Sequence, residues 1–151
     1  ESGDEVVLVD GTYHMYFTGT AVDFGVNHEI GHATSPDGIT WTMDPQNPVM
    51  TPEDEGDWEV TSYISLDVLH DGNEFQMWYG GCQSGAGCRV GMATSPDGST
   101  WTRYSENPVF GPGRVGSFDY CYVSTSPVLR RAGRDQGGVR LVRRSVGRLP
   151  S

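Results

Sequence analysis

A 17-residue segment occurs twice in this chain. Residues 33–49 read ATSPDGITWTMDPQNPV, and residues 93–109, 60 positions later, read ATSPDGSTWTRYSENPV, with 12 of the 17 positions identical. A long internal period indicates an architecture built from stacked supersecondary units, because one such unit cannot bury its apolar face alone. This repeat constrains the fold more than any single residue does.

Each unit contains four short runs rich in β-branched and aromatic residues. An apolar run ends at an Asp-Gly pair (residues 10–11 and 71–72), and an aromatic run, a loop, ATSPDG and Thr-Trp-Thr follow. Asp-Gly favours a tight hairpin because glycine tolerates the positive φ that the turn requires. No helical periodicity of useful length appears. A repeated unit of four antiparallel strands is typical of the blades of a β-propeller. A β-sandwich is the alternative all-β fold, but it does not explain why the sequence contains an internal copy.

The repeat also divides the chain. We expect a first blade at residues 1–57 with its first strand truncated, a second blade at 58–113, the inner strand of a third blade at 114–129, and a basic tail at 130–151. A closed propeller needs about 4–8 blades. The chain is therefore expected to be a fragment of about two blades.

The tail departs from the repeat in charge and composition. Residues 1–129 hold 19 acidic residues and three Arg, net −16, and residues 130–151 hold seven Arg and one Asp, net +6, which sum to the chain's −10. A genuine basic arm, plain divergence and a shifted reading frame all stay open. We favour the frameshift as a hypothesis. Codons can be chosen for residues 140–145 such that a shifted reading frame of the same DNA encodes Gly-Trp-Tyr-Gly. This is the aromatic motif that the repeat leads us to expect in this region and that the tail lacks.

The acidic body limits the partners that residues 1–129 can have. This segment contains no Lys and has a net charge of −16, which argues against nucleic acid and anionic membranes. No run approaches the roughly 18 apolar residues of a membrane-spanning helix. Open blade edges would expose unpaired strands, so self-association through them is a further expectation.

The chain has three cysteines, Cys82, Cys88 and Cys121. Cys82 and Cys88 flank a predicted hairpin loop, so we expect their β-carbons to lie within bridging distance. A disulfide there would fit an extracellular or periplasmic protein, and two reduced thiols are the alternative; the sequence leaves both open. A Cys-x5-Cys pair with no nearby His is a poor zinc site.

The blade motifs carry a family resemblance. Units of the form aromatic-Met-Tyr/Trp-Tyr-x-Gly, followed by Ile/Val-Gly-x-Ala-Thr-Ser-Pro-Asp-Gly-x-x-Trp, resemble the five-bladed β-propeller glycoside hydrolases of families 43, 32 and 130, over residues 7–129. The resemblance implies an incomplete five-bladed propeller and a carbohydrate substrate. The resemblance alone also implies a calcium ion in the central channel of the propeller. No group of residues in this sequence requires a cofactor or a metal.

Two conspicuous motifs are interpreted as structure. In the Ser-Pro-Asp-Gly segments at 35–38 and 95–98, Pro presets φ, Asp accepts backbone N–H groups and Gly takes a left-handed conformation. Repetition argues against a catalytic role, because a catalytic residue needs no copy in each blade. A His-Glu-x-x-His-like stretch at 28–32 aligns with a strand of the second unit, not with the helix that a zinc site of this type needs.

Three carboxylates are candidates for catalysis. Glycoside cleavage needs two carboxylates across the scissile bond, one a general acid of raised pKa and the other a base or nucleophile. The resemblance implies that each comes from a different blade, where the inner strands line the channel. Glu59 and Asp119 are equivalent across the repeat, and each follows an aromatic residue ahead of an inner strand; Asp67 lies within such a strand. The alternative for Glu59 and Asp119 is a repeated loop carboxylate that hydrogen-bonds the neighbouring blade.

Tyr63, Tyr120 and Tyr122 are candidates for an aromatic platform under a sugar ring, with core packing as the alternative. The Asp-Pro usual in family 43 is replaced by Leu-Asp-Val at 66–68 and Ser-Pro-Val at 126–128, which weakens a family-43 mechanism in particular. We therefore expect part of a glycoside hydrolase, inactive as a fragment. A non-catalytic sugar-binding or scaffold propeller and an inactive self-assembling remnant are the alternatives.

Overall fold

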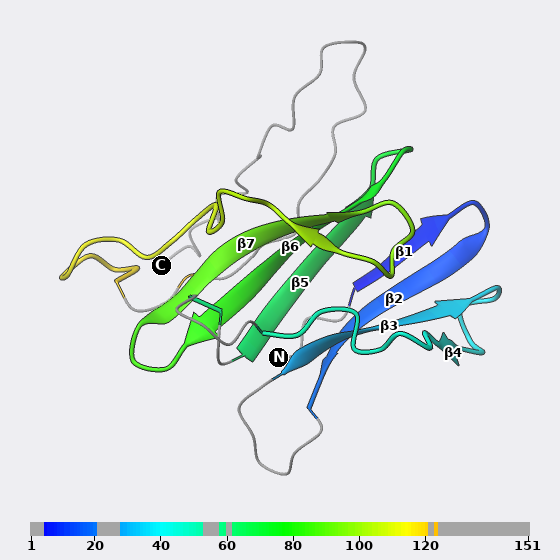
Figure 1. The fold of residues 1–151 in the computed structure, drawn as a ribbon, viewed down its shortest axis with the longest axis horizontal. Helices are drawn as coiled ribbons and strands as arrows, with labels where there is room; N and C mark the ends of the chain where they lie inside the picture. Colours follow the sequence, from blue (N-terminus) through cyan, green and yellow to red (C-terminus); the bar gives the residue numbers. More distant parts are fainter. Residues whose placement is uncertain (1–4, 21–27, 53–57, 60–61, 121–122, 124–151) are drawn as a thin grey trace, which may run out of the picture.

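The fold is all-β, as expected. A computed structural model describes residues 5–20, 28–52, 58–59, 62–120 and 123, which form two four-stranded antiparallel sheets, β1-β2-β3-β4 and β5-β6-β7-β8 (Figure 1). Consecutive strands are neighbours in both sheets, as in a propeller blade. The strands are β1 (Glu5–Val9), β2 (Thr12–Gly19), β3 (Glu29–Ser35), β4 (Thr42–Met43), β5 (Ser62–His70), β6 (Phe75–Gln83), β7 (Gly87–Ser95) and β8 (Thr102–Arg103). Within the described ranges, no helix has the length and apolarity needed to cross a bilayer.

The Asp-Gly pairs form the predicted hairpin turns. Asp10 and Gly11 have φ angles of 47° and 80°, so both central residues of the β1–β2 turn take the left-handed conformation that a type I′ hairpin requires. In the second sheet, the Asp71 carboxylate accepts hydrogen bonds from the backbone N–H groups of Asn73 (2.8 Å) and Glu74 (3.1 Å). Both turns place the first two strands of a sheet side by side.

The Ser-Pro-Asp-Gly loops are held by their own side chains. Ser35 Oγ accepts the Gly38 N–H at 2.9 Å, and Asp37 Oδ1 accepts the N–H groups of Ile39 (2.9 Å) and Thr40 (2.8 Å). Hydrogen bonds from the Thr40 and Ile39 backbone lower the pKa of Asp37 to about 2. The loop at 95–98 makes the corresponding bonds. These carboxylates are engaged in loop structure, which agrees with the interpretation made from their repetition.

The repeated Asn-Pro-Val segments complete the outer side of each sheet. Asn47 accepts the His32 N–H and donates to the His32 carbonyl, both at 2.8 Å. Asn107 does the same with the backbone of Met92, both at 2.9 Å. The amide side chain thus takes the place of a strand neighbour and satisfies backbone groups beyond the short strands β4 and β8.

The apolar core lies between the two sheets. Strand β5 contacts β1, β2 and β3, so the second sheet packs on the first through its leading strand (Figure 1). Three tyrosines are fully buried there, one from the first sheet and two from the second. The buried members of this core are Tyr16, Ile30, Met50, Tyr63, Leu66, Val68, Phe75, Met77, Tyr79 and Ala93.

A chain of polar side chains crosses the same interface. His14 Nδ1 lies 3.0 Å from His32 Nε2, and His32 Nδ1 lies 2.8 Å from Asp44 Oδ2. Ser99, from the Ser-Pro-Asp-Gly loop of the second sheet, donates a hydrogen bond to the same Asp44 oxygen. His32 is only 2% exposed. The three residues of the first unit and Ser99 therefore join the two sheets through partly buried hydrogen bonds.

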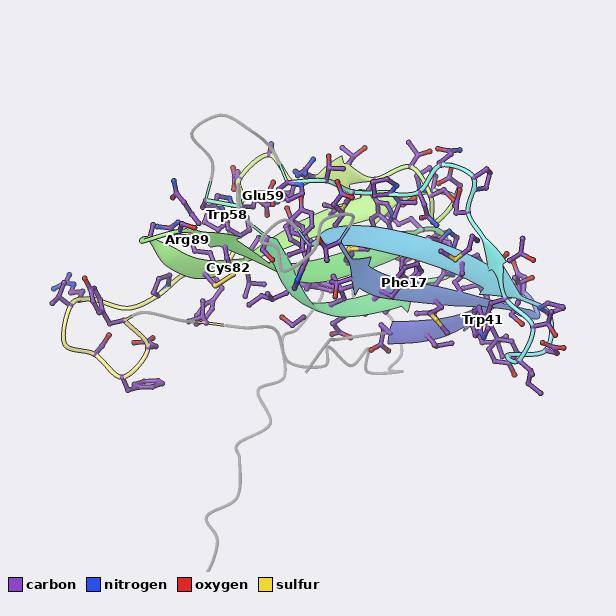
Figure 2. All side chains as sticks on the ribbon, turned by 90° about the horizontal axis from the view of Figure 1, so that it is seen from below. Phe17, Trp41, Trp58, Glu59, Cys82 and Arg89 are labelled. Carbon is purple, nitrogen blue, oxygen red and sulfur yellow. A yellow bond between two sulfur atoms is a disulfide. The ribbon has the colours of Figure 1, made fainter. Side chains whose placement is uncertain are left out.

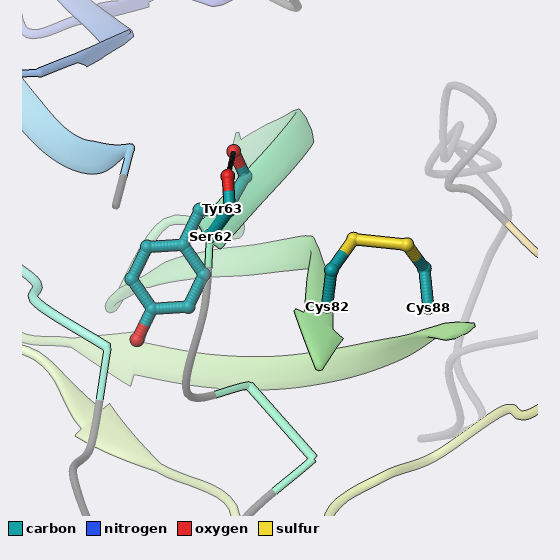
Figure 3. Close-up of a disulfide and its surroundings, with 4 residues drawn as sticks. All are labelled: Ser62, Tyr63, Cys82 and Cys88. Atoms are coloured by element: carbon teal, nitrogen blue, oxygen red, sulfur yellow. Dashed lines mark hydrogen bonds between the residues drawn. A yellow bond between two sulfur atoms is a disulfide. The ribbon is translucent and has the colours of Figure 1, made fainter. Parts of the chain in front are cut away.

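Cys82 and Cys88 form a disulfide. They are directly paired across β6 and β7, with their α-carbons 4.1 Å apart (Figure 3). Of the two alternatives that the sequence left open, the structure contains the bridged one. Cys121 lies outside the described residues.

We expect His14 to make the stability of the sheet interface depend on pH. Burial lowers the pKa of His14, and the nearby His32 and His70 lower it further. An unfolded histidine has a pKa of about 6.5, so the unfolded state binds more protons just below that pH. The stabilisation should be fully present above about pH 6.5 and be lost as the pH falls from there towards the pKa of folded His14.

Urea unfolding at a series of pH values between 8 and 5 checks this, with His14→Gln as the matched variant because Gln76 occupies the corresponding position in the second unit. We expect the variant to lose less stability over this range than the parent chain. Equal losses would contradict a role for His14.

Candidate functional site

Asp67 lies on β5, the strand by which the second sheet contacts the first. Its side chain is buried, with 6% exposure, and its partner across the ladder is Trp78 on β6. The flanking residues Leu66 and Val68 both belong to the core between the sheets. Because successive side chains of a strand alternate between faces, Asp67 is on the opposite face from that core.

A second carboxylate lies on β1, the first strand of the other sheet, which is in contact with β5. Glu5 on β1 is half-buried, and its pKa is raised chiefly by burial and further by the charge of Asp67. The two groups therefore interact electrostatically although they come from different sheets. A carboxyl of raised pKa beside a second carboxyl is the arrangement that acid–base pairs use. Glu5 was missed from the sequence because the repeat gives no signal that marks it as a site residue.

Glu59 occupies a different position, buried beside the second sheet. Figure 2 shows Glu59 next to Trp58. Only 2% of Glu59 is exposed, and its Oε1 lies 2.6 Å from Nε of Arg103 on β8. Burial raises the pKa of Tyr79. The negative charge of Glu59 and the hydrogen bond between the Tyr79 and Glu59 side chains raise that pKa further. The Glu59 carboxylate thus contacts both a cation and a phenol within the protein.

Arg103 links this carboxylate to the first unit. Its Nη2 donates to the Thr51 carbonyl at 2.6 Å and to the Tyr63 hydroxyl at 2.5 Å. The Tyr63 hydroxyl in turn donates to the Thr51 carbonyl at 2.8 Å. Burial alone would lower the pKa of Arg103, but the charges of Tyr63 and Glu59 outweigh it and raise that pKa. Tyr63 is fully buried in this network.

Two glycines make the space in which Trp58 and Glu59 lie. A Cβ atom at Gly81 would be 2.6 Å from both Trp58 Cζ3 and Glu59 Cβ, and one at Gly91 would be 2.8 Å from Trp58 Cη2. The Trp58 ring is stacked on Tyr79, with centroids 5.9 Å apart. The Trp-Glu pair therefore docks on a surface that only glycine leaves open.

Asp119, the repeat counterpart of Glu59, is in a different environment. It is half-buried in the loop at 114–120, where Ser117 Oγ donates to its Oδ1 at 2.6 Å and the Gly113 N–H to its carbonyl at 3.3 Å. The preceding Phe118 is fully exposed. Figures 1 and 2 show this loop projecting beyond the β6–β7 hairpin. The hydrogen bonds described for Asp119 are thus all local to its own loop.

The structure therefore separates the residues predicted from the sequence. The charge of Asp67 raises the pKa of Glu5, Glu59 and Tyr63 share the Arg103 network, and Asp119 and the exposed Tyr120 lie on the projecting loop. Tyr122 lies outside the described residues. Among the residues that the structure describes, no three His, Cys, Asp or Glu side chains form a group able to hold a metal ion, and calcium stays a prediction from resemblance.

Comparison with known proteins gives the chain a family. Residues 3–117 match the model of the Glycosyl hydrolases family 32 N-terminal domain. An uncharacterized protein of Mycobacterium tuberculosis (strain H37Rv) is 29% identical over 107 residues, which are 68% of this chain and 33% of that protein. The chain thus spans about a third of the length of this curated relative.

Solved structures match the fold. Fructan 1-exohydrolase IIa from Cichorium intybus aligns with a TM-score of 0.61 at 24% identity, over 74% of this chain and 22% of the exohydrolase. A thermostable family-43 glycoside hydrolase aligns with a TM-score of 0.58 at 21% identity, over 73% of this chain and 38% of that enzyme. The expected resemblance to a part of the propeller glycoside hydrolases is confirmed.

The packing of Trp58 and Glu59 against Gly81 can be tested by substitution, and the first unit of the repeat supplies the control residue. Gly81→Ala should displace Trp58 or Glu59 and destabilise the chain by about 1–3 kcal/mol, the usual cost of overpacking. Gly19 is the corresponding residue of the first unit, and a Cβ there meets nothing within 4 Å. Thermal unfolding followed by tryptophan fluorescence should show a lower Tm for Gly81→Ala only. Equal effects of the two substitutions would contradict this packing.

The Arg103–Glu59 pair can be tested in the same way. Arg103→Met, which introduces the residue found at position 43 of the first unit, leaves the buried Glu59 carboxylate without its cation and should cost about 3 kcal/mol in urea unfolding. The double variant Arg103→Met/Glu59→Gln should recover part of this loss, because no buried charge is then uncompensated. A double variant as unstable as the sum of the single ones would show that the two side chains do not interact.

Proposed function

Because the chain belongs to the family of the Glycosyl hydrolases family 32 N-terminal domain, we propose that the protein it partly spans cleaves glycosidic bonds in a poly- or oligosaccharide. The fructan 1-exohydrolase that shares its fold has been solved with 1-kestose bound, which supports a carbohydrate substrate. The chain covers about a third of its curated relative, so the reaction is assigned to the whole protein.

The proposed mechanism is based on Glu5 and Asp67, because their strands β1 and β5 are in contact and the charge of Asp67 raises the pKa of Glu5. Glycoside hydrolysis uses one carboxyl as an acid, which protonates the leaving oxygen, and a second as a base or nucleophile. Glu5 has the raised pKa that suits the acid, and Asp67 is the second carboxylate. They come from the leading strands of two neighbouring sheets, which is where the resemblance implies that the reacting groups of a propeller lie.

This proposal assigns non-catalytic roles to the other residues predicted from the sequence. The ion pair with Arg103 supports a role for Glu59 in holding the two units together rather than in contacting sugar. Asp119 and Tyr120 lie on the projecting loop, and the 46% exposure of Tyr120 supports a role in stacking on a sugar ring. The second class of function is a sugar-binding or scaffold propeller without catalysis. The buried ion pair of Glu59 with Arg103 is equally consistent with this alternative.

Substitution of the pair in the full-length protein tests the mechanism. Glu5→Gln and Asp67→Asn should each lower kcat by about 10²–10⁴-fold, the contribution expected from a positioned proton donor or acceptor, with sugar binding retained. Activity should fall at high pH in the parent protein as Glu5 loses its proton, and Glu5→Gln should lack this fall. Release of reducing sugar from fructan and from aryl arabinofuranosides, xylosides and mannosides measures the rates.

Asp10→Asn is the matched control, because this carboxylate lies at the turn at the other end of β1 and Asn tolerates its left-handed φ of 47°. It should keep full turnover. Full turnover in Glu5→Gln and Asp67→Asn would reject the pair, and loss of turnover in Glu59→Gln or Asp119→Asn instead would return the role to those residues. A parent protein that binds sugar without turnover would establish the non-catalytic alternative.

A further inference from the structure

The second sheet has a small apolar cluster on the face that is turned away from the core between the sheets, which we call the outer face. Trp78 on β6 lies between Met77 and Tyr79, which both belong to that core. Because side chains of a strand alternate between faces, Trp78 is on the outer face. It is buried there together with Val90 of β7 and with Val123.

This cluster repeats the interface by which the first sheet receives the second. Its three members correspond in the repeat to three buried residues of the core between the sheets, Tyr16, Ile30 and Tyr63. The backbone confirms the correspondence. Ile30 N–H donates to the Met50 carbonyl at 2.9 Å, and Val90 N–H donates to the Phe110 carbonyl at 2.8 Å. The outer face of the second sheet is therefore equivalent to the face of the first sheet on which β5 packs.

The two faces differ in how much of them is covered. Phe110 is 46% exposed, whereas its counterpart Met50 is 4% exposed. Tyr104 is also 46% exposed, whereas the side chain of its counterpart Asp44 is 6% exposed. The second unit covers both positions of the first, because Met50 belongs to the core between the sheets and Ser99 donates a hydrogen bond to Asp44. Large apolar side chains are thus exposed at the positions that a neighbouring unit covers in the first sheet.

The outer face also differs from its counterpart in polarity. Met92 replaces His32 and Tyr104 replaces Asp44, with the same backbone pairing: the Asp44 N–H donates to the His32 carbonyl at 3.0 Å, and the Tyr104 N–H to the Met92 carbonyl at 2.9 Å. In the first sheet, the carboxylate accepts the hydroxyl of Ser99. A thioether and a phenol offer no charged acceptor at the matching place. Burial of a hydroxyl without such a partner is costly, so an apolar residue fits there better.

We infer that the outer face, together with Tyr104 and Phe110, is the docking surface for a third unit of the same full-length chain, and that this unit has an apolar residue at the position of Ser99. Contiguous exposed apolar side chains mark interaction sites on soluble proteins. Val123 belongs to the same chain and takes the place that Tyr63 takes in the first interface, which makes the following part of the chain the occupant.

Cysteine labelling of the full-length protein and of residues 1–151 tests the docking surface. Phe110→Cys is compared with Met50→Cys, at the buried counterpart, and with Gln46→Cys, at an exposed residue of the first unit. Peptide mass spectrometry separates the introduced thiol from Cys121. In residues 1–151, Phe110→Cys should react as fast as Gln46→Cys. In the full-length protein it should react at least about tenfold more slowly, because a covered thiol reacts only after local opening.

The same experiment identifies the occupant. Protection of Phe110→Cys in a monomeric full-length protein, unchanged on dilution, supports a third unit of the same chain. Protection that is lost on dilution would assign the surface to a second copy of the chain and overturn the inference. Equally fast labelling in the full-length protein and in residues 1–151 would also overturn it. Hydrogen exchange of residues 104–110 in the unsubstituted proteins gives the same comparison if Phe110→Cys does not fold.

The chemistry of the occupant is tested by giving the second sheet the polar groups of the first. The double variant Met92→His/Tyr104→Asp should lower the Tm of the full-length protein more than that of residues 1–151. Only the full-length protein would bury the new carboxylate against an apolar residue. A smaller loss in the full-length protein than in residues 1–151 would show that the third unit presents a hydrogen-bond donor there, and would contradict the apolar residue.

Discussion

The burial of one face of each sheet against the other is the interaction on which the rest of the structure depends. A four-stranded sheet with an apolar face is not stable in water until that face is covered. Here Tyr16 from the first sheet and Tyr63 and Tyr79 from the second fill the space between them and are fully buried. At roughly 25 cal/mol per Å² of apolar surface removed from water, burial of these large aromatic side chains stabilises the contact between the sheets.

The polar groups at the same interface determine how the two sheets meet. Arg103 reaches from the outer strand of the second sheet to the Thr51 carbonyl beyond the first, and Ser99 reaches Asp44. Buried ion pairs contribute little net stability because both charges lose water, but a misplaced partner is costly. Such contacts therefore favour one relative placement of the sheets. That placement brings β1, which carries Glu5, into contact with β5, which carries Asp67.

Much of the fold could be predicted from the sequence, because the repeat marks local features. The Asp-Gly turns and the Ser-Pro-Asp-Gly loops depend on residues a few positions apart, and both form as expected. The site was harder to predict, because it depends on contacts between distant segments. The sequence contains no marker of the β-bulge on β5, where the register of the ladder shifts between Ile64 and Leu66. It also does not show that Arg103 would reach Glu59. The repeat equivalence of Glu59 and Asp119 suggested a shared role, but their environments differ.

The central claim is that a carboxylate from each of two neighbouring sheets acts on the substrate. A crystal structure of the full-length Asp67→Asn protein with a bound oligosaccharide tests it most directly. We expect the scissile glycosidic oxygen to lie within hydrogen-bonding reach of Glu5, and the residue at position 67 to face the anomeric carbon. An oligosaccharide bound with its scissile bond away from both strands, for example against the loop that carries Asp119, would contradict the claim.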